Sequence, residues 1–191
     1  VINEKGKLIG SGTDGPGALK AIVDAGVEIN GKKVLMLGSG GAARAIAFTL
    51  ARNAELEMLL ILDVNEMMLQ KLTSDLKAGT HAFIESGLLD ESSLAAAMEA
   101  SDVIIHCTPI GMHPNEGNSL IPAELFRPEQ VIFDIVYTPL ETKLLAEAKS
   151  RGLKVISGVD MFINQAVLQF EHFMGVDAPV EVMRRALMEH L

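Results

Sequence analysis

The feature that most constrains the fold is the stretch from residue 34 to 46, where a short apolar run leads into closely spaced glycines and then a helical pattern. Residues 33–37 have the length and apolar character of a buried strand, and apolar or small residues then recur at helical spacing, at Ala42, Ala45, Ile46, Thr49 and Leu50. Gly38 permits a tight turn, Gly40 lets the backbone approach a pyrophosphate, and Ala43 lets the helix lie close to the strand. Because the first N–H groups of a helix are unpaired and its dipole attracts anions, this pattern predicts a phosphate-binding turn.

The next strand supports a dinucleotide as the ligand. Residues 59–62 form a second apolar run, and Asp63 closes it. Asp63 follows Gly40 at about the 20-residue separation expected of an acid that binds a ribose 2′-hydroxyl. The alternative is a structural glycine turn in another α/β domain, with Asp63 only capping a helix that begins near Glu66.

Composition limits the class of protein. The chain has 191 residues, 49% of them hydrophobic, which suits one globular domain or a little more. A net charge of −9 argues against nucleic acid and anionic membrane as partners. Cys107 is the only cysteine, which excludes an internal disulfide; it is interpreted as a small buried hydrophobe, with a reactive thiol as the alternative. No apolar run reaches the ~18 residues of a spanning helix and no signal peptide opens the chain, so the expected location is cytoplasmic.

The order of the elements predicts an α/β fold. Short apolar strands alternate with helical patterns, which indicates a doubly wound, mostly parallel sheet of about six strands with helices on both faces and strand order 3-2-1-4-5-6. The strands are expected at residues 33–37, 59–62, 81–84, 102–107, 131–134 and 154–156, and the helices after an N-cap at Asp14 and at 42–50, 66–77, 91–98, 141–150, 161–174 and 180–191. The organisation is a linker arm and helix (1–29), a dinucleotide-binding core (30–160) and C-terminal helices (161–191).

Residues 108–117 form a loop rich in Gly and Pro directly after the fourth strand. In a doubly wound sheet this position is the carboxyl edge, where ligands bind. His106 and His113 lie nearby, but neither has a paired acid in the sequence, so neither is given a catalytic role, and no metal site is expected.

Three further motifs appear in order around the glycine turn Gly38-Ser-Gly-Gly-Ala-Ala-Arg44. They are Gly10-x-x-Thr13-Asp14-Gly15-x-Gly17, Asp134-x-x-Tyr137-x-Pro139-x-x-Thr142 and Gly158-x-x-Met161-x-x-x-Gln165-Ala166. With them the chain resembles the cofactor-binding half of shikimate dehydrogenases, including the quinate/shikimate branch. The resemblance implies a Rossmann-type domain and a reversible NAD(P)-linked oxidation of shikimate, or quinate, to its 3-dehydro ketone, in the pathway to the aromatic amino acids.

The resemblance also assigns roles to residues. Asp14 matches the aspartate of a catalytic lysine–aspartate pair, whose lysine belongs to an N-terminal substrate domain that this chain does not contain; the chain is therefore expected to be a fragment, nearly inactive alone. Asp14, Tyr137 and Gln165 are implied to bind substrate. The implied cofactor-binding residues are Gly38, Ser39, Gly40, Gly41, Ala42, Asp63, Val64, Asn65, Thr108, Pro109, Ile110, Ile135 and Gly158. Without the resemblance, Asp14 would be interpreted as a helix cap. The alternative for Tyr137 is ordinary packing, and the alternative for Gln165 is a polar residue on the flank of a helix.

Departures from the family pattern bear on the cofactor. NADP-using members commonly carry Asn-Arg-Thr after the second strand, whereas this chain has Asp63-Val64-Asn65. Because the Asp63 carboxylate would repel a 2′-phosphate, NAD is expected to be preferred over NADP. Gly12 replaces a usual asparagine, and Asp160 replaces a frequent small residue beside the nicotinamide.

Two other functions are compatible with the sequence. One is a dehydrogenase of a folate-type or pterin-type carrier, against which the motifs around Tyr137 and Gln165 count. The other is a non-catalytic dinucleotide-sensing module. The expected partner is a small-molecule hydroxy-acid substrate, with no nucleic acid and no membrane, and a homodimer is left open.

Overall fold

The computed structural model describes residues 1–190 and contains one six-stranded parallel sheet with the strand order β5-β4-β3-β6-β7-β8. Its strands are β3 (Lys33–Leu37), β4 (Met58–Asp63), β5 (Ile84–Leu88), β6 (Val103–His106), β7 (Val131–Asp134) and β8 (Lys154–Ile156). Counted along the chain, this is the order 3-2-1-4-5-6. The predicted doubly wound α/β topology is confirmed, and the sheet is wholly rather than mostly parallel.

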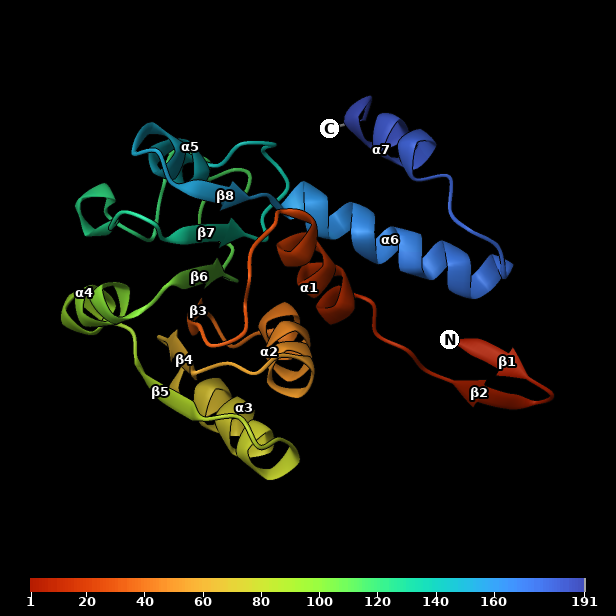
Figure 1. The fold of residues 1–191 in the computed structure, drawn as a ribbon, viewed down its shortest axis with the longest axis horizontal. Coiled ribbons are helices and arrows are strands. Elements are labelled where there is room, and N and C mark those ends of the chain that lie inside the picture. Colours follow the sequence, from red (N-terminus) through yellow and green to blue (C-terminus); the bar gives the residue numbers. More distant parts are fainter. Residues whose placement is uncertain (191) are drawn as a thin grey trace.

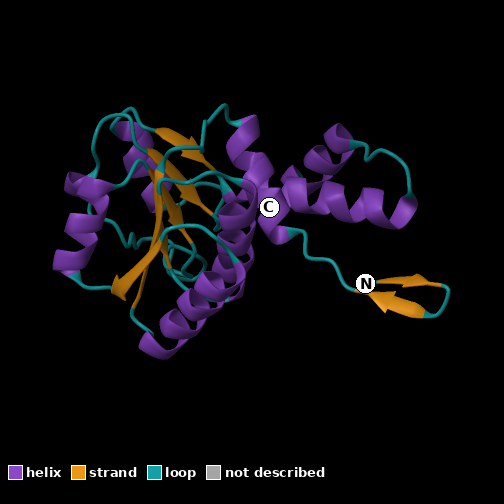
Figure 2. Ribbon diagram, turned by 60° about the horizontal axis from the view of Figure 1, so that its bottom comes forward, coloured by secondary structure: helices purple, strands orange, loops and turns teal. Residues whose placement is uncertain are grey.

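Helices cover both faces of the sheet (Figure 2). The helices are α1 (Asp14–Asp24), α2 (Gly41–Asn53), α3 (Glu66–Gly79), α4 (Glu91–Ala100), α5 (Lys143–Ser150), α6 (Gly158–Met174) and α7 (Val180–Met188), with a short 3₁₀ turn, η1, at Ala123–Leu125. Val34 and Met36 of β3 pack in the core with α1, α2 and α3, and Leu35 and Leu37 pack in the core with α4 and α5. Side chains alternate across a strand, so a strand covered on both faces must be apolar throughout, as this one is.

The connections create a crevice at one edge of the sheet. From β3 the chain moves outward through α2 and α3 to β5, and α4 then returns it to β6 on the other side of β3 (Figure 1). At the carboxyl ends of β3 and β6 the chain therefore leaves toward opposite faces. Such a reversal of strand order is where doubly wound folds bind ligands.

The N-terminal part differs from its prediction. Where a strand or extended arm is expected, β1 (Ile2–Glu4) and β2 (Lys7–Ile9) form a small antiparallel hairpin apart from the main sheet (Figure 1). The prediction that Asp14 is a helix cap is also wrong, because Thr13 occupies the N-cap position and the helix begins at Asp14. The helix ends at Asp24, and Gly26 follows it with a φ of +67°.

Most element boundaries differ from their predictions by a few residues, and those of β5 and α6 have a clear physical reason. The third strand, expected at 81–84, lies at Ile84–Leu88. Ile84 is the only buried residue of this edge strand, and Glu85, Ser86 and Gly87 after it have no apolar side chain that would predict a strand. Helix α6 begins three residues before its expected start, at Gly158, because Ser157 and Asp160 form a capping box. Asp160 also contacts Arg184 of α7 at 3.2 Å, which accounts for the carboxylate at this position.

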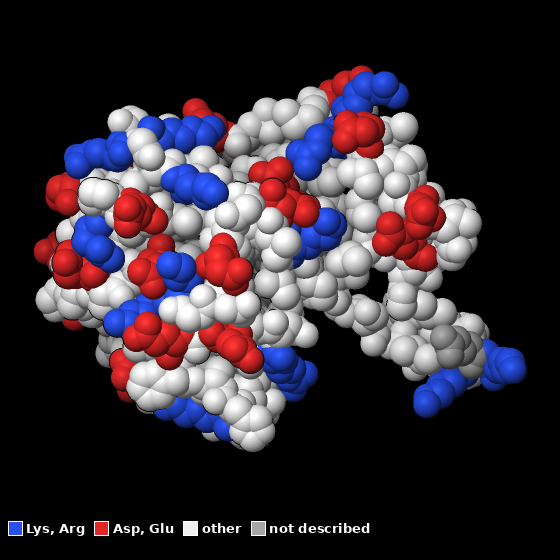
Figure 3. All heavy atoms as spheres, viewed as in Figure 1, with Lys and Arg blue, Asp and Glu red and all other residues white. Residues whose placement is uncertain are grey.

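The surface carries both signs of charge. Acidic and basic side chains are interspersed over the face seen in Figure 3. None of the helices in residues 1–190 has the length and apolar character needed to cross a bilayer.

Candidate functional site

The carboxyl ends of β3, β4 and β6 surround a cavity of about 400 Å³, which we call the nucleotide cleft. Eight of the predicted cofactor residues line it: Gly38, Ser39, Gly40, Asp63, Val64, Thr108, Pro109 and Ile110. Met68, Leu89, Cys107 and Leu120 complete its wall. Segments far apart in the sequence thus meet at the crevice where the fold predicts a ligand.

Gly38 is needed for the turn itself. Its φ of +107° lies in the region that favours glycine, and its N–H donates to the carbonyl oxygen of Leu62 at 2.8 Å. A Cβ at this position would stand 2.8 Å from the carbonyl oxygen of Cys107. The turn after β3 is therefore pressed against the end of β6, which leaves no room for a side chain.

Gly40 is free of such constraints inside the chain. It is the N-cap of α2, with a φ of −70°, and a Cβ there would meet no atom within 4 Å. The space in front of the helix start is therefore open, and the first N–H groups of a 13-residue helix face it. Nothing inside the chain requires a glycine at this position, so the requirement must come from a ligand in the open space. A pyrophosphate bound there fits this requirement.

Asp63 holds the glycine turn in place. Its Oδ2 accepts hydrogen bonds from the N–H and the Oγ of Ser39, both at 2.6 Å, and its Oδ1 accepts one from the N–H of Asn65 at 2.8 Å. The cap of α3 is Asn65, whose side chain accepts from the N–H of Met68 at 3.1 Å. The alternative in which Asp63 caps that helix is therefore wrong, and its carboxylate is directed into the turn.

A second cavity of about 250 Å³, which we call the ring pocket, lies at the start of α1, α2 and α6. Its lining contains all three predicted substrate residues, Asp14, Tyr137 and Gln165, and three predicted cofactor residues, Ala42, Ile135 and Gly158. Met161 and Phe162 complete the lining. Gly40 lines the nucleotide cleft and Ala42 lines the ring pocket, so the first turn of α2 separates the two cavities.

Close packing of α6 against α1 and against the segment after β7 sets the positions of the residues around the ring pocket. A Cβ on Gly17 of α1 would lie 2.8 Å from the backbone nitrogen of Gln165 on α6, so the two helices touch through their backbones. A Cβ on Gly158 would overlap the carbonyl oxygens of Ile135 and Val136. These two glycines bring Asp14 and Gln165 to one cavity, beside the loop that carries Tyr137.

Three residues of this region carry no functional prediction from the sequence. Thr13 donates to the Oε1 of Gln165 at 3.3 Å and accepts from the Nε2 of Gln169 at 3.0 Å, and Gln169 also donates to Gln165. Phe162 stacks on Tyr137 with ring centroids 4.9 Å apart. The signal for Phe162 and Gln169 was their spacing from Gln165, which places all three on one face of α6.

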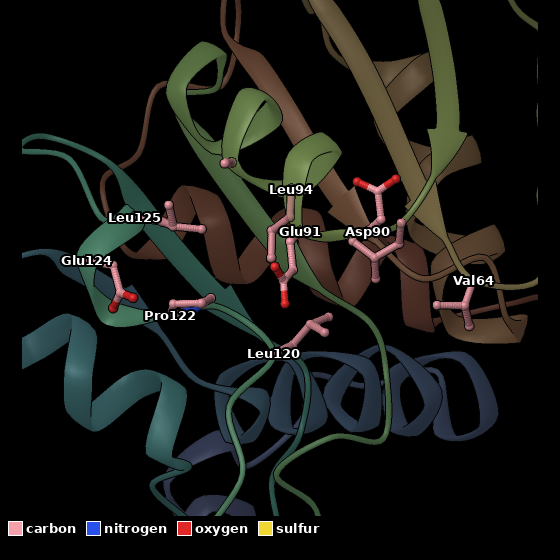
Figure 4. A pocket seen from close by; sticks show the side chains of 10 residues that line it. Val64, Asp90, Glu91, Leu94, Leu120, Pro122, Glu124 and Leu125 are labelled. Atoms are coloured by element: carbon pink, nitrogen blue, oxygen red, sulfur yellow. The ribbon is translucent and has the colours of Figure 1, made fainter.

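A third cavity of about 590 Å³ adjoins the nucleotide cleft and shares Val64, Leu89 and Leu120 with it (Figure 4). It lies between the start of α4 and η1, with the side chains of Glu91 and Leu94 on one side and Pro122 on the other. The cleft therefore continues beyond Asp63 along the sheet edge. Gly41 and Asn65, also predicted to bind cofactor, line none of these three cavities; Gly41 is the first residue of α2 and Asn65 the N-cap of α3.

His106 corrects the expectation of an unpaired histidine. The parallel register sets His106 at the end of β6 opposite Asp134 at the end of β7, and Nδ1 lies 2.9 Å from the Asp134 Oδ1. Both side chains are buried. His113 instead forms an exposed pair with Glu116 at 2.6 Å, and its hydrogen bond lowers the pKa of that carboxyl group.

Cys107 directly follows β6, is partly buried and lines the nucleotide cleft. Burial, together with the charge of Asp134, raises the pKa of its thiol above the ordinary range. Within residues 1–190, no three His, Cys, Asp or Glu side chains are gathered as a metal site requires.

The fold and the cleft together define a class. A parallel sheet in this order, with a glycine turn before α2 and a carboxylate at the end of β4, is a dinucleotide-binding domain of the Rossmann type. The family model described as "Shikimate 5'-dehydrogenase C-terminal domain" matches residues 158–188, that is α6 and α7.

Comparisons over the whole chain identify the family. The chain is 40% identical to "Shikimate dehydrogenase (NADP(+))" of Methanosarcina acetivorans and 41% identical to the protein of the same name from Pyrococcus abyssi; each match covers 100% of this chain and 67% of the relative. The crystal structure of shikimate 5-dehydrogenase from Listeria monocytogenes, in complex with shikimate and NAD, superposes with a TM-score of 0.91 at 30% identity, covering 97% of this chain and 66% of that one. The chain therefore belongs to the shikimate dehydrogenase family of oxidoreductases and spans about two thirds of the length of these relatives.

The predicted preference for NAD is wrong. Both curated relatives are named for NADP(+), and so are those from Methanosarcina mazei and Moorella thermoacetica. The prediction treats the Asp63 charge as free to meet a 2′-phosphate, whereas the carboxylate accepts three hydrogen bonds and faces the glycine turn. Donors that share the charge in this way reduce the repulsion on which the prediction rests.

Proposed function

We propose that this chain forms the cofactor-binding part of an NADP-dependent shikimate dehydrogenase, which transfers a hydride reversibly between shikimate and its 3-dehydro ketone. The observation that carries this proposal is the adjacency of the two cavities across the first turn of α2, with Gly40 in one and Ala42 in the other. A dinucleotide whose pyrophosphate sits at that helix start can extend its nicotinamide toward the ring pocket. A ring hydroxyl bound between Asp14 and Gln165 would then lie beside it.

The chain's residues divide the binding between them. The turn of Gly38 to Gly40 would hold the pyrophosphate, and the loop Thr108 to Ile110 would form the floor under the ribose and nicotinamide. Ile135 and Gly158 would border the nicotinamide. When bound, NADP supplies the acceptor for the hydride.

The substrate side needs groups that recognise hydroxyls and move a proton. The Gln165 amide both donates and accepts hydrogen bonds, which suits a polyol, and Thr13 and Gln169 hold it in place. In oxidation the electron pair of the carbinol C–H bond leaves as hydride, while the hydroxyl proton must pass to a base. Asp14 would orient and charge-stabilise that base, which in the family pattern is a lysine. Tyr137, stacked on Phe162, would close one side of the ring pocket.

The proposal is tested by absorbance at 340 nm with the protein as its gene encodes it, NADP⁺ and shikimate. Asp14→Asn should lower kcat by about 10²–10⁴-fold, as loss of a positioned acid–base group does. Gln165→Leu should raise KM for shikimate and leave the affinity for NADP⁺ unchanged. Asp24→Asn, on the same helix but outside both cavities, serves as the matched control. A wild-type protein that binds NADP⁺ but reduces none with shikimate would overturn the proposal.

Quinate is the second substrate that the same pocket could take. It also presents ring hydroxyls to Gln165, so the two acids belong in one assay under equal conditions. The cytoplasmic location remains a prediction.

A further inference from the structure

Behind the nucleotide cleft lies a buried chain of hydrogen bonds that the proposed function does not use. It runs from Ile110 through Thr108 and His106 to Asp134, and continues to Thr142. His106 is 1% exposed and Asp134 is fully buried. A buried imidazole beside a buried carboxylate is costly unless the polar atoms of both have hydrogen-bond partners, and here they do.

The roles of donor and acceptor can be assigned along this series of hydrogen bonds. The Oγ1 of Thr142 accepts from the N–H of Leu145 at 3.3 Å and donates to the Oδ2 of Asp134 at 2.6 Å, while the Oδ1 of Asp134 accepts from the N–H of Val136 at 3.1 Å. Asp134 therefore acts only as an acceptor, and the Nδ1 of His106 must carry the proton that it donates at 2.9 Å.

The proton on Nδ1 determines whether the other ring nitrogen, Nε2, donates or accepts a hydrogen bond. In a neutral imidazole the Nε2 then has a lone pair, so it accepts from the Thr108 hydroxyl at 2.5 Å. The Oγ1 of Thr108 accepts in turn from the N–H of Ile110 at 3.3 Å. Thr108 and Ile110 both line the nucleotide cleft, and the Cγ2 of Thr108 would lie 3.3 Å from a Cβ on Gly38.

We propose that His106 is a positioning residue for the cofactor. Held by Asp134, it fixes the rotamer of Thr108 and the direction of its hydroxyl, and through the N–H of Ile110 it sets the shape of the cleft floor. This inference rests on the proposed function, because the cleft floor matters only if a dinucleotide lies on it. His106 touches no cofactor atom in this scheme; it acts through Thr108.

Binding of NADPH to matched variants tests the proposal. Thr108→Val keeps the shape of the side chain but removes the hydroxyl, and His106→Leu removes both ring nitrogens at similar volume. Each should raise the Kd for NADPH by about five- to tenfold, the range of one lost hydrogen bond. The double variant should be no weaker than the weaker single variant, because both changes break the same link. His106→Asn, whose amide keeps one donor and one acceptor, should restore most of the affinity, and His81→Gln, at an exposed site, should bind as wild type.

Stability is measured beside affinity, because the leucine variant removes one of the three donors to the buried Asp134 carboxylate. A purely structural role for His106 predicts lowered stability with unchanged Kd, or losses that add in the double variant; either result overturns the proposal. The tautomer gives a readout without cofactor: ¹⁵N NMR of the imidazole, assigned by its loss in His106→Asn, should show the proton on Nδ1. A proton on Nε2 overturns the network even if NADPH binds. A wild-type protein with the expected tautomer that binds no NADPH overturns the proposed function and, with it, this role.

Discussion

Two glycines of one turn should respond to alanine in opposite ways. Gly38→Ala forces a side chain into a left-handed backbone, which costs about 1–2 kcal/mol, and places it 2.8 Å from the Cys107 carbonyl oxygen, where overpacking adds about 1–3 kcal/mol. We expect a total loss of about 2–5 kcal/mol, or a Tm lower by roughly 4–20 °C for a chain of this size. Gly40→Ala meets no atom of the chain and needs no unusual φ, so its stability should stay within about 1 kcal/mol of wild type.

The functional effects should be reversed. A Cβ at Gly40 occupies the space in front of α2, where it would block a charge-assisted hydrogen bond to a phosphate worth about 1.5–3 kcal/mol. The Kd for NADPH, measured by isothermal titration calorimetry, should rise at least about tenfold. Urea unfolding with an unchanged m value gives the stability. Normal NADPH binding by Gly40→Ala, or wild-type stability of Gly38→Ala, would refute this view of the turn.

Three further outcomes follow from packing and burial. Gly17→Ala should destabilise the protein by about 1–3 kcal/mol and raise KM for shikimate, because its Cβ would lie 2.8 Å from the Gln165 nitrogen, whereas Gly10→Ala faces open space and should be silent in both assays. Asp134→Ala should cost about 1–3 kcal/mol in urea unfolding for each donor left unsatisfied, since the Nδ1–H of His106 and the hydroxyl of Thr142 both lose their acceptor; a loss under about 1 kcal/mol would contradict the network. At pH 8, Cys107 should react with a thiol reagent more than about tenfold slower in the folded than in the unfolded chain. The reason is that its raised pKa keeps the thiol protonated as the pH rises through the ordinary thiol range. Equal rates would show an exposed thiolate.

The sequence predicted the sheet well because its central strands are buried on both faces. Apolar runs such as Val34 to Leu37 and Val131 to Phe133 have no other stable position in a chain of this length. The prediction failed where a strand buries few or no apolar side chains. The edge strand β5 buries only Ile84, and the N-terminal hairpin forms outside the core, so neither has an apolar pattern that fixes its place.

Some residues of the site could also be predicted from the sequence, and some of its contacts could not. Gly38 and Asp63 were identified by their spacing along the chain, and Asp14, Tyr137 and Gln165 by the family resemblance. The structure brings the first two to the nucleotide cleft and the other three to the ring pocket. The pairing of His106 with Asp134 could not be seen, because it depends on the register between β6 and β7. The direction of the Asp63 side chain was likewise hidden, and the wrong cofactor preference followed from it.

Transfer of deuterium tests the proposed function most directly. Shikimate that carries deuterium on the carbinol carbon to be oxidised is incubated with NADP⁺ and the protein as its gene encodes it, and the reduced cofactor is analysed by mass spectrometry. If the ring pocket and the nucleotide cleft hold the two reactants as proposed, the deuterium should appear in the reduced cofactor, and Asp14→Asn should slow its appearance. Reduced cofactor without deuterium, or no reduction although NADP⁺ binds, would contradict hydride transfer between these two cavities.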